Sequence, residues 1–161
     1  HGFEGAVVHG STIRGVLLKA MTNAVNIVLA PSGWSNIRYS ATTKEVIATH
    51  KDQGDVPVSY LSDGVRNMLG MVADIAYRAV RLNPHLAENA VKETNGIVLI
   101  DEVDMHLHPQ WQQLVLQNLS EAFPNIQFIV TTHSPQVLST VKQDQIRVLP
   151  DVAAGETDAL P

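Results

Sequence analysis

The sequence predicts an α/β fold with a mostly parallel sheet, and three observations support this class. Two short runs of β-branched and aliphatic residues, 97–100 and 126–130, have the composition of buried strands. A segment with helical spacing of apolar residues, 109–122, lies between them, and the connecting loops are short. Strand, helix and strand in this order are typical of parallel βαβ units, in which ligands bind at the carboxyl ends of the strands.

The first third of the chain predicts one helix and one β-hairpin. Ser11 is a candidate N-cap for a helix over residues 12–23, where apolar residues recur at helical spacing. Residues 37–39 and 45–50 have strand composition and predict a hairpin. Residues 52–55 predict a turn.

The middle of the chain predicts a longer amphipathic helix. Ser62 is its candidate N-cap, and Pro84 stops it after about residue 82. The apolar face of this helix would consist of Val65, Leu69, Val72, Ala73, Ala76 and Val80. Residues 83–95 are polar and contain Asn-Pro and Asn-Gly pairs, so they predict a loop or a short helix.

The last third carries the βαβ pattern. The strand over residues 97–100 has no polar position, so we expect it to be buried on both faces. Pro109 is well placed to start the following helix. Thr131 and Thr132 either continue the second strand, which we favour, or contact a ligand site at its end. The remaining expected elements are a helix over 135–141, a third strand over 146–149 and a tail or linker over 151–161.

Composition excludes several classes of protein. The 161 residues contain no cysteine, which excludes a disulfide scaffold, a thiolate zinc site and a cysteine nucleophile. The net charge is −5 and the 11 Lys and Arg residues form no cluster, so this segment by itself does not predict a nucleic-acid surface. A nucleic-acid partner bound elsewhere in the protein stays open. The apolar runs are far shorter than the ~20 residues of a membrane-spanning helix, and no signal peptide is visible, so we expect a cytoplasmic protein with no membrane partner.

Three polar residues follow the two predicted strands. Asp101 and Glu102 come directly after the first strand, and His133 comes just after the second. If the strands are neighbours, these side chains meet at one edge of the sheet, within roughly 5–10 Å of each other. An apolar strand that ends in Asp-Glu is the usual way to place a magnesium-directing carboxylate and a water-activating one at a phosphoryl-transfer site. The plainer interpretation is that the two acids cap the segment that follows.

A second candidate site lies at the start of the helix that follows Ser62. Ser62 at the cap and Gly64 in the first turn leave backbone N–H groups uncovered, and the helix dipole favours an anion there. Taken alone, the same residues fit an ordinary N-cap.

Four motifs, in their order and spacing, carry a family resemblance. They are residues 61–66 (LSDGVR), 96–102 (GIVLIDE), 107–109 (LHP) and 130–135 (VTTHSP). Over about residues 57–150 the chain resembles ABC-class ATPase heads of the RecF/SMC-like branch. Within that branch it is similar to the bacterial AAA family ATPases of Septu-type anti-phage systems and of some retrons. The resemblance implies a P-loop NTPase-like three-layer fold.

The resemblance also implies roles for individual residues. Residues 97–101 look like a Walker B strand, in which Asp101 would hold Mg²⁺ and Glu102 would orient the attacking water as the base. His133 looks like the switch histidine that contacts the γ-phosphate of ATP, and residues 103–108 occupy the D-loop region, which crosses the dimer seam.

The segment 61–66 looks like the ABC signature. In the family its Ser and Gly reach the γ-phosphate of ATP bound to the opposite subunit, and Ser62 and Gly64 would take those roles. Arg66 could contact a phosphate or lie in solvent.

The chain departs from the family pattern in two respects. In the signature, Asp63 and Val65 stand where ABC transporters usually carry Gly and Gln, although Asp63 is acceptable in the RecF/SMC-like branch. The second departure is more serious. The phosphate-binding Walker A loop, G-x-x-x-x-G-K-S/T, does not occur in it. We therefore expect a partial head with the Walker A half upstream of His1, and a segment that binds ATP weakly by itself. In this division residues 1–56 are a partial N-terminal portion with a helix and a hairpin, residues 57–150 are the signature-to-switch half, and residues 151–161 are a tail or linker.

The resemblance further implies partners. An intact head would dimerise with a second copy around ATP, because signature and Walker elements complement each other across the interface. Its cycle would drive an effector, such as a nuclease, in phage defence. Two alternatives stay open: a metal-dependent hydrolase built on Asp101, Asp104, His106, His108 and His133, and a non-catalytic interaction module.

Overall fold

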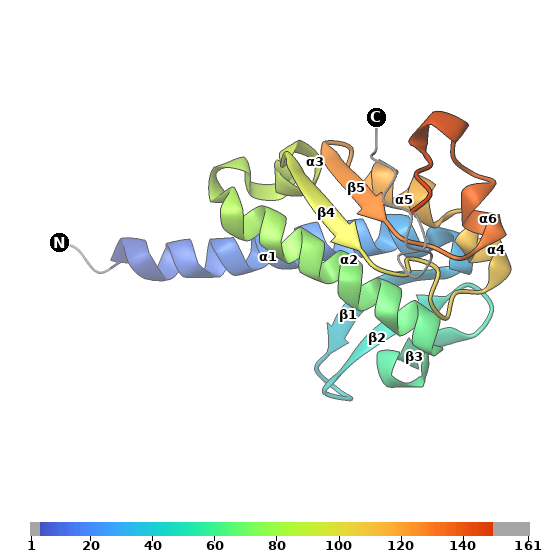
Figure 1. Ribbon diagram of the computed structural model, residues 1–161. Helices are drawn as coiled ribbons and strands as arrows, with labels where there is room; N and C mark the ends of the chain where they lie inside the picture. Colours follow the sequence, from blue (N-terminus) through green and yellow to red (C-terminus); the bar gives the residue numbers. More distant parts are fainter. Residues whose placement is uncertain (1–3, 150–161) are drawn as a thin grey trace.

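The computed structural model describes residues 4–149, with side chains from residue 15 onward (Figure 1). It contains a long first helix, an antiparallel three-stranded sheet and a parallel pair of strands, so the chain has a mixed α/β fold. The elements are α1 (Glu4–Leu29), η1 (Ala30–Ser32), β1 (Trp34–Ser40), β2 (Glu45–His50), β3 (Gly54–Pro57), η2 (Val58–Tyr60), α2 (Asp63–Leu82), η3 (Pro84–Asn89), α3 (Ala90–Glu93), β4 (Gly96–Ile100), α4 (Pro109–Gln112), α5 (Val115–Ala122), β5 (Ile126–Val130), α6 (Pro135–Leu138) and η4 (Gln143–Gln145).

The first helix is longer than the sequence predicts. α1 begins at Glu4, so residue 11 lies inside it, and the prediction that Ser11 caps a helix is wrong. The sequence places no proline between residues 4 and 30 that could stop the helix earlier. The helical path ends at Gly33, whose left-handed φ of 81° suits a residue without a Cβ and whose N–H donates to Ala30 O at 3.0 Å.

The predicted hairpin is confirmed, and a third strand joins it. β1 pairs with β2 and β2 with β3, all antiparallel. The predicted turn over 52–55 is confirmed at residues 52 and 53, where the chain turns. It is wrong at residues 54 and 55, which belong to β3. Polar side chains hold β3 in place: Thr49 Oγ1 donates to Asp55 Oδ1 at 2.7 Å, and Arg38 Nη1 donates to Thr49 Oγ1 at 2.9 Å.

The predicted central helix is confirmed as α2. Its N-cap Ser62 has extended backbone angles, and the Ser62 hydroxyl accepts from the Val65 N–H at 3.5 Å. The helix ends at Leu82, before Pro84. It runs along α1, as Figure 1 shows, and its apolar face packs in the common core. The polar stretch that follows forms the short helices η3 and α3.

The two predicted βαβ strands are confirmed, and they are parallel neighbours. Their register runs from Gly96 opposite Ile126 to Ile100 opposite Val130. The prediction of burial on both faces is wrong, because Ile97 and Leu99 are 60% and 77% exposed. The residues that alternate with them, Val98 and Ile100, pack against the core.

The described residues therefore cover one face of this sheet and leave the other open. Ile129, on β5, is also half exposed on the open side. A third layer over this face stays a prediction. The predicted third strand over 146–149 is wrong: these residues lie outside any strand, and Val148 and Leu149 are 86% and 78% exposed. The Ile146 N–H instead closes a turn onto Gln143 O at 3.2 Å.

Two predicted helices are shorter than expected. The segment 109–122 is divided into α4 and α5, because the chain makes a turn at Gln113 and Leu114. The helix predicted over 135–141 ends at Leu138. The hydroxyls of Ser139 and Thr140 donate to carbonyls three residues earlier, at 2.7 Å each, and compete with helical bonding.

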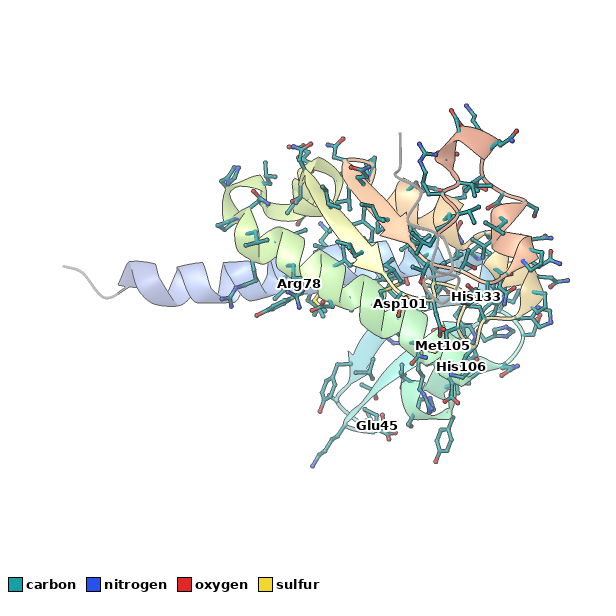
Figure 2. The ribbon with its side chains drawn as sticks, in the orientation of Figure 1. Glu45, Arg78, Asp101, Met105, His106 and His133 are labelled. Atoms are coloured by element: carbon teal, nitrogen blue, oxygen red, sulfur yellow. The ribbon has the colours of Figure 1, made fainter. Side chains whose placement is uncertain are left out.

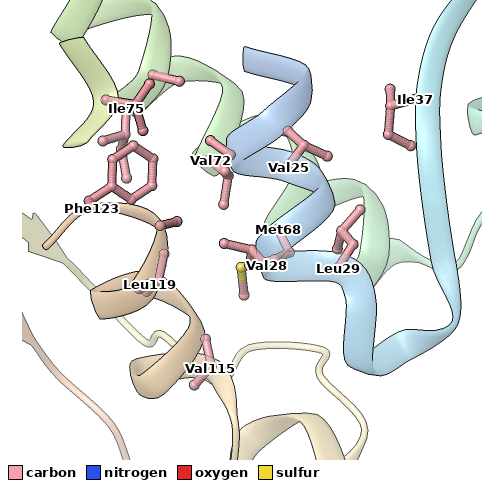
Figure 3. Packing of buried hydrophobic residues seen from close by; sticks show 14 of the residues in the cluster. Val25, Val28, Leu29, Ile37, Met68, Val72, Ile75, Val115, Leu119 and Phe123 are labelled. Carbon is pink, nitrogen blue, oxygen red and sulfur yellow. The ribbon is translucent and has the colours of Figure 1, made fainter. Parts of the chain in front are cut away.

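One hydrophobic core joins these elements (Figure 3). α1 contributes Val25 and Val28, α2 contributes Val72, and α5 contributes Leu119. Phe123, just after α5, is fully buried between α5 and the sheet and meets Phe128 of β5 edge to face, with ring centroids 6.2 Å apart. Within residues 4–149 we find no helix whose length and hydrophobicity would let it cross a membrane.

Candidate nucleotide-hydrolysis site

The carboxyl ends of β4 and β5 meet at one edge of the parallel sheet, as the sequence predicts. The Thr131 N–H donates to Ile100 O at 3.0 Å, which extends the contact just past the last paired residues. Asp101 and Glu102 follow β4, and His133 follows β5. All three side chains are exposed, and Figure 2 shows Asp101 and His133 toward the same end of the sheet.

Thr131 joins the two strand ends. Its hydroxyl donates to Asp101 Oδ1 at 2.5 Å and accepts from the Glu102 N–H at 2.8 Å. Its carbonyl oxygen accepts from the Val103 N–H at 3.1 Å. The prediction that Thr131 and Thr132 continue the strand is wrong, because β5 ends at Val130 and both threonines turn to the loop after β4. The position of Thr131, a polar residue directly after an apolar strand, is the sequence feature that could have predicted that it joins the two strand ends.

Glu102 has an unusual backbone conformation. Its φ is +49°, in the left-handed region that non-glycine residues seldom adopt. Such a conformation persists only where the surroundings fix it, and here Thr131 holds the Glu102 N–H and the following N–H of Val103. The backbone at Glu102 is therefore fixed, while its carboxylate stays exposed to solvent.

The loop after β4 is anchored by two apolar residues. Val103 and Leu107 are buried in the core, whereas Met105 and His106 between them are exposed (Figure 2). His106 also has a positive φ, of 62°. His108 caps α4, since its Nδ1 accepts from the Gln110 N–H at 3.3 Å, as expected for a residue that fixes the loop before Pro109.

The start of α2 contacts this loop through Gly64. A Cβ at Gly64 would lie 2.3 Å from the His106 carbonyl oxygen, so only glycine fits there. Ser62 caps the helix with its side chain exposed. Arg66 donates to Ser59 O at 2.9 Å and pairs with Asp63, so its guanidinium holds the turn that precedes α2. The structure thus brings residues 61–66 and the loop after β4 together by backbone packing.

The exposed Asp101 carboxylate is a candidate metal ligand at the sheet edge. Among the residues whose side chains the structure describes, no three His, Asp or Glu side chains converge on a point that could hold a metal. The metal-dependent hydrolase alternative, which needs such a cluster, gains no support. Mg²⁺ in phosphoryl-transfer sites takes one or two carboxylates with phosphate and water oxygens, and the exposed Asp101 carboxylate fits that need.

The chain matches a protein family over residues 26–139, more than half of its length. That family is described as "AAA domain, putative AbiEii toxin, Type IV TA system". The match includes the start of α2, both parallel strands and the segment around His133.

Several curated relatives share this segment. The chain is 46% identical over 113 residues to "Retron Vc95 probable ATPase" of Vibrio cholerae, covering 70% of this chain and 22% of that protein. It is 45% identical over 117 residues to "Retron Ec83 probable ATPase" of Escherichia coli, covering 73% and 21%. It is 30% identical over 121 residues to "Septu protein PtuA" of Bacillus thuringiensis, covering 71% and 30%. The chain thus spans less than a third of the length of each of these three relatives.

Two solved structures share the fold. One, on ATP-driven dimerization and DNA-stimulated activation of SMC ATPases, has a TM-score of 0.56 at 16% identity and covers 82% of this chain and 77% of that chain. The other, an SMC head bound to the C-winged helix domain of ScpA, has a TM-score of 0.50 at 19% identity and covers 75% and 36%. These structures show that the chain shares the fold of SMC heads. The family match shows that the chain belongs to the AAA_21 family, with the retron probable ATPases and the Septu protein PtuA among its relatives.

Proposed function

We propose that this chain supplies the signature, Walker B and switch elements of an ATP-hydrolysing head. The observation that carries the proposal is the Thr131 hydroxyl, which bonds both Asp101 and the backbone of Glu102 at one edge of a parallel sheet. Phosphoryl transfer is mostly a matter of positioning and of neutralising charge. A strand end that fixes the Asp101 carboxylate and the backbone of the adjacent Glu102 serves both needs.

Asp101 would direct Mg²⁺. The magnesium ion, when bound with ATP, neutralises charge that develops on the phosphates. Thr131 holds one Asp101 oxygen, which limits rotation of the carboxylate and leaves it open at the sheet edge.

Glu102 would act as the general base. Its backbone is fixed by Thr131, and its carboxylate is exposed, where it can accept a proton from water. Glu102 has a positive φ and Asp101 does not, so the two side chains leave the backbone in different directions and can take different roles. His133, after β5, would contact the γ-phosphate at the same edge.

The start of α2 would bind the γ-phosphate of ATP held by a second copy of the head. α2 has 20 residues and a serine cap, so its first turn favours an anion. Ser62 would contribute its hydroxyl, and Gly64 would keep the first turn close to the loop around His106. Arg66 would act mainly by holding the turn at Ser59 and Asp63.

We propose two partners, a second copy of the head and an effector protein. A head with its signature in one copy and its Walker elements in another is complete only as a dimer, so we propose ATP-dependent dimerisation in the cytoplasm. The retron and Septu relatives suggest that the cycle serves phage defence and drives an effector such as a nuclease.

The test is Glu102→Gln in the protein as its gene encodes it. We expect ATP hydrolysis to fall by about 100-fold or more, since a positioned base contributes roughly 10²–10⁴-fold. ATP binding should persist, and light scattering should show an ATP-dependent dimer that does not dissociate. Glu121→Gln, at an exposed position on α5, is the matched control and should hydrolyse ATP normally. Normal hydrolysis by the Glu102 variant would rule out its role as base.

A further inference from the structure

The side-chain amide of Gln112 lies between the loop after β4 and the segment after β5. Its Nε2 donates to Leu107 O at 3.0 Å and lies 3.5 Å from Asp104 O. Its Oε1 accepts from the Ser134 hydroxyl at 2.8 Å. One partly buried amide on α4 therefore holds both segments at once.

A second link runs beside the first. The Thr132 hydroxyl donates to the Asp104 carboxylate, and the Ser134 N–H donates to the Thr132 hydroxyl at 3.0 Å. Ser134 is buried, and its hydroxyl also accepts from the N–H groups of Gln136 and Val137 at the start of α6. His133 thus lies between two residues that are both bonded to the loop network.

We propose that Gln112 is a positioning residue that couples the loop 101–108 to the His133 imidazole. The inference rests on the proposed function and deepens it, because it says how a movement of the loop 101–108 would reach His133. Hydrogen bonds in a partly buried network are stronger than exposed ones and act as a unit, so a shift of the loop is passed to residues 132–134.

The loop is placed to receive such a shift. Met105 and His106, at its tip, are exposed, while Gly64 contacts the His106 carbonyl from the α2 side. A second head that pressed on the tip would move the backbone carbonyls to which Gln112 is bonded. Gln112 contacts neither Asp101 nor Glu102 by a hydrogen bond in the part of the chain that the structure describes, so its effect on hydrolysis would be exerted through its neighbours.

The neighbouring residue provides a matched control. The Gln113 amide donates to Gln136 Oε1 at 2.6 Å, on the surface, and makes no hydrogen bond to the loop among the described residues. Gln112→Leu removes the amide that joins loop and switch segment. Gln113→Leu removes an amide of the same type one position away that joins only α6.

The first measurement is steady-state ATP hydrolysis by the protein as its gene encodes it. We expect Gln112→Leu to lower kcat by about 10- to 100-fold, with KM for ATP changed by less than about twofold, because it misplaces catalytic groups without removing a contact to ATP. Gln112→Glu keeps the acceptor for Ser134 but loses the donor to Leu107 O, so it should not restore kcat. Gln113→Leu should match the wild type. Equal kcat for Gln112→Leu and Gln113→Leu would overturn the proposal.

The second measurement is backbone hydrogen exchange in the absence of nucleotide. Gln112→Leu should accelerate exchange of the Leu107 and Ser134 amides together, and Gln113→Leu should leave both unchanged. Acceleration in the loop alone would show that the segments are not coupled, and the proposal would then fail. If the wild-type protein hydrolyses no ATP, the proposed function fails, while the exchange pattern still decides whether Gln112 joins the two segments.

Discussion

Gly64 at the start of α2 lies directly against the carbonyl oxygen of His106, with no room for a side-chain carbon between them. A Cβ built on Gly64 would lie 2.3 Å from that oxygen and 3.0 Å from the carbonyl carbon. Both contacts are with backbone, which cannot rotate aside as a side chain can. Gly64 is therefore required by packing within one chain, independently of any phosphate that it would approach in the proposed function.

We expect Gly64→Ala to destabilise the protein by roughly 1–3 kcal/mol, because the loop or the helix must shift to make room. Gly70→Ala, on the same helix, is the matched control. An added Cβ at Gly70 meets nothing within 4 Å, so alanine there should stabilise the protein by roughly 0.5–1 kcal/mol. Urea unfolding checks both, and a Gly64→Ala protein as stable as the wild type would contradict the contact.

Thr131→Val should abolish most ATP hydrolysis with little loss of stability. Valine has nearly the same shape but cannot donate to Asp101 or accept from the Glu102 N–H. Thr131→Ser retains the hydroxyl and should retain most activity. Thr140→Val, which removes a hydroxyl just after α6 that bonds Val137 O, should leave hydrolysis unchanged. Assays of ATP turnover beside thermal unfolding separate loss of the site from loss of the fold, and an active Thr131→Val protein would show that the link is dispensable.

Leu119→Ala should destabilise the protein by about 2–5 kcal/mol, since it leaves a cavity among helices. Leu119 is fully buried where α5 packs against α1, in the core that α2 also joins (Figure 3). Leu82→Ala, at the exposed end of α2, should change stability by less than about 0.5 kcal/mol. Chemical denaturation measures both, and similar losses for the two variants would contradict the core described above.

The pKa of Asp55 should respond to Thr49. Hydrogen bonding from the Thr49 hydroxyl, with a smaller contribution from the Arg38 guanidinium, holds the pKa of the Asp55 carboxyl below its ordinary value of 3.8. Because the folded-state pKa is depressed, the stabilisation from this group is present above the unfolded-state value and is lost as the pH falls through the folded-state value.

Thr49→Val should therefore raise the pKa of Asp55 toward 3.8. Titration of the Asp55 carboxyl carbon by NMR follows this shift directly. Thr43→Val, in the exposed turn between β1 and β2, serves as the control and should leave the titration of Asp55 unchanged. An unaltered Asp55 pKa in Thr49→Val would show that the hydroxyl is not the main cause.

The elements with strong local signals could be predicted from the sequence. The cap at Ser62, the apolar face of α2 and the β-branched runs of β4 and β5 each determine their structure through neighbouring residues. The sequence also predicts that Asp101 and Glu102 lie beside the end of β5, because parallel strands end at the same edge of a sheet.

The errors arise where distant residues decide the structure. Ser11 resembles a cap by its local context, yet α1 begins upstream of it. Residues 146–149 have strand composition but no strand beside them in the described structure. The left-handed φ of Glu102 could not be expected of glutamate, because Thr131, 29 positions later, holds it. The bond between Gln112 and Ser134 likewise spans 22 positions and leaves no local pattern.

The open face of the β4–β5 sheet has a consequence for handling the molecule. Ile97, Leu99 and Ile129 give it an apolar surface that water does not favour, and such surfaces associate with one another. A sample in which this face stays uncovered should therefore form oligomers without nucleotide, and salting-out ions should promote them. An ATP-dependent dimer would have the opposite signature, since it would require ATP and would disperse on hydrolysis. Oligomers of this segment report on ATP-dependent dimerisation only when Leu99→Lys has made the apolar sheet face polar.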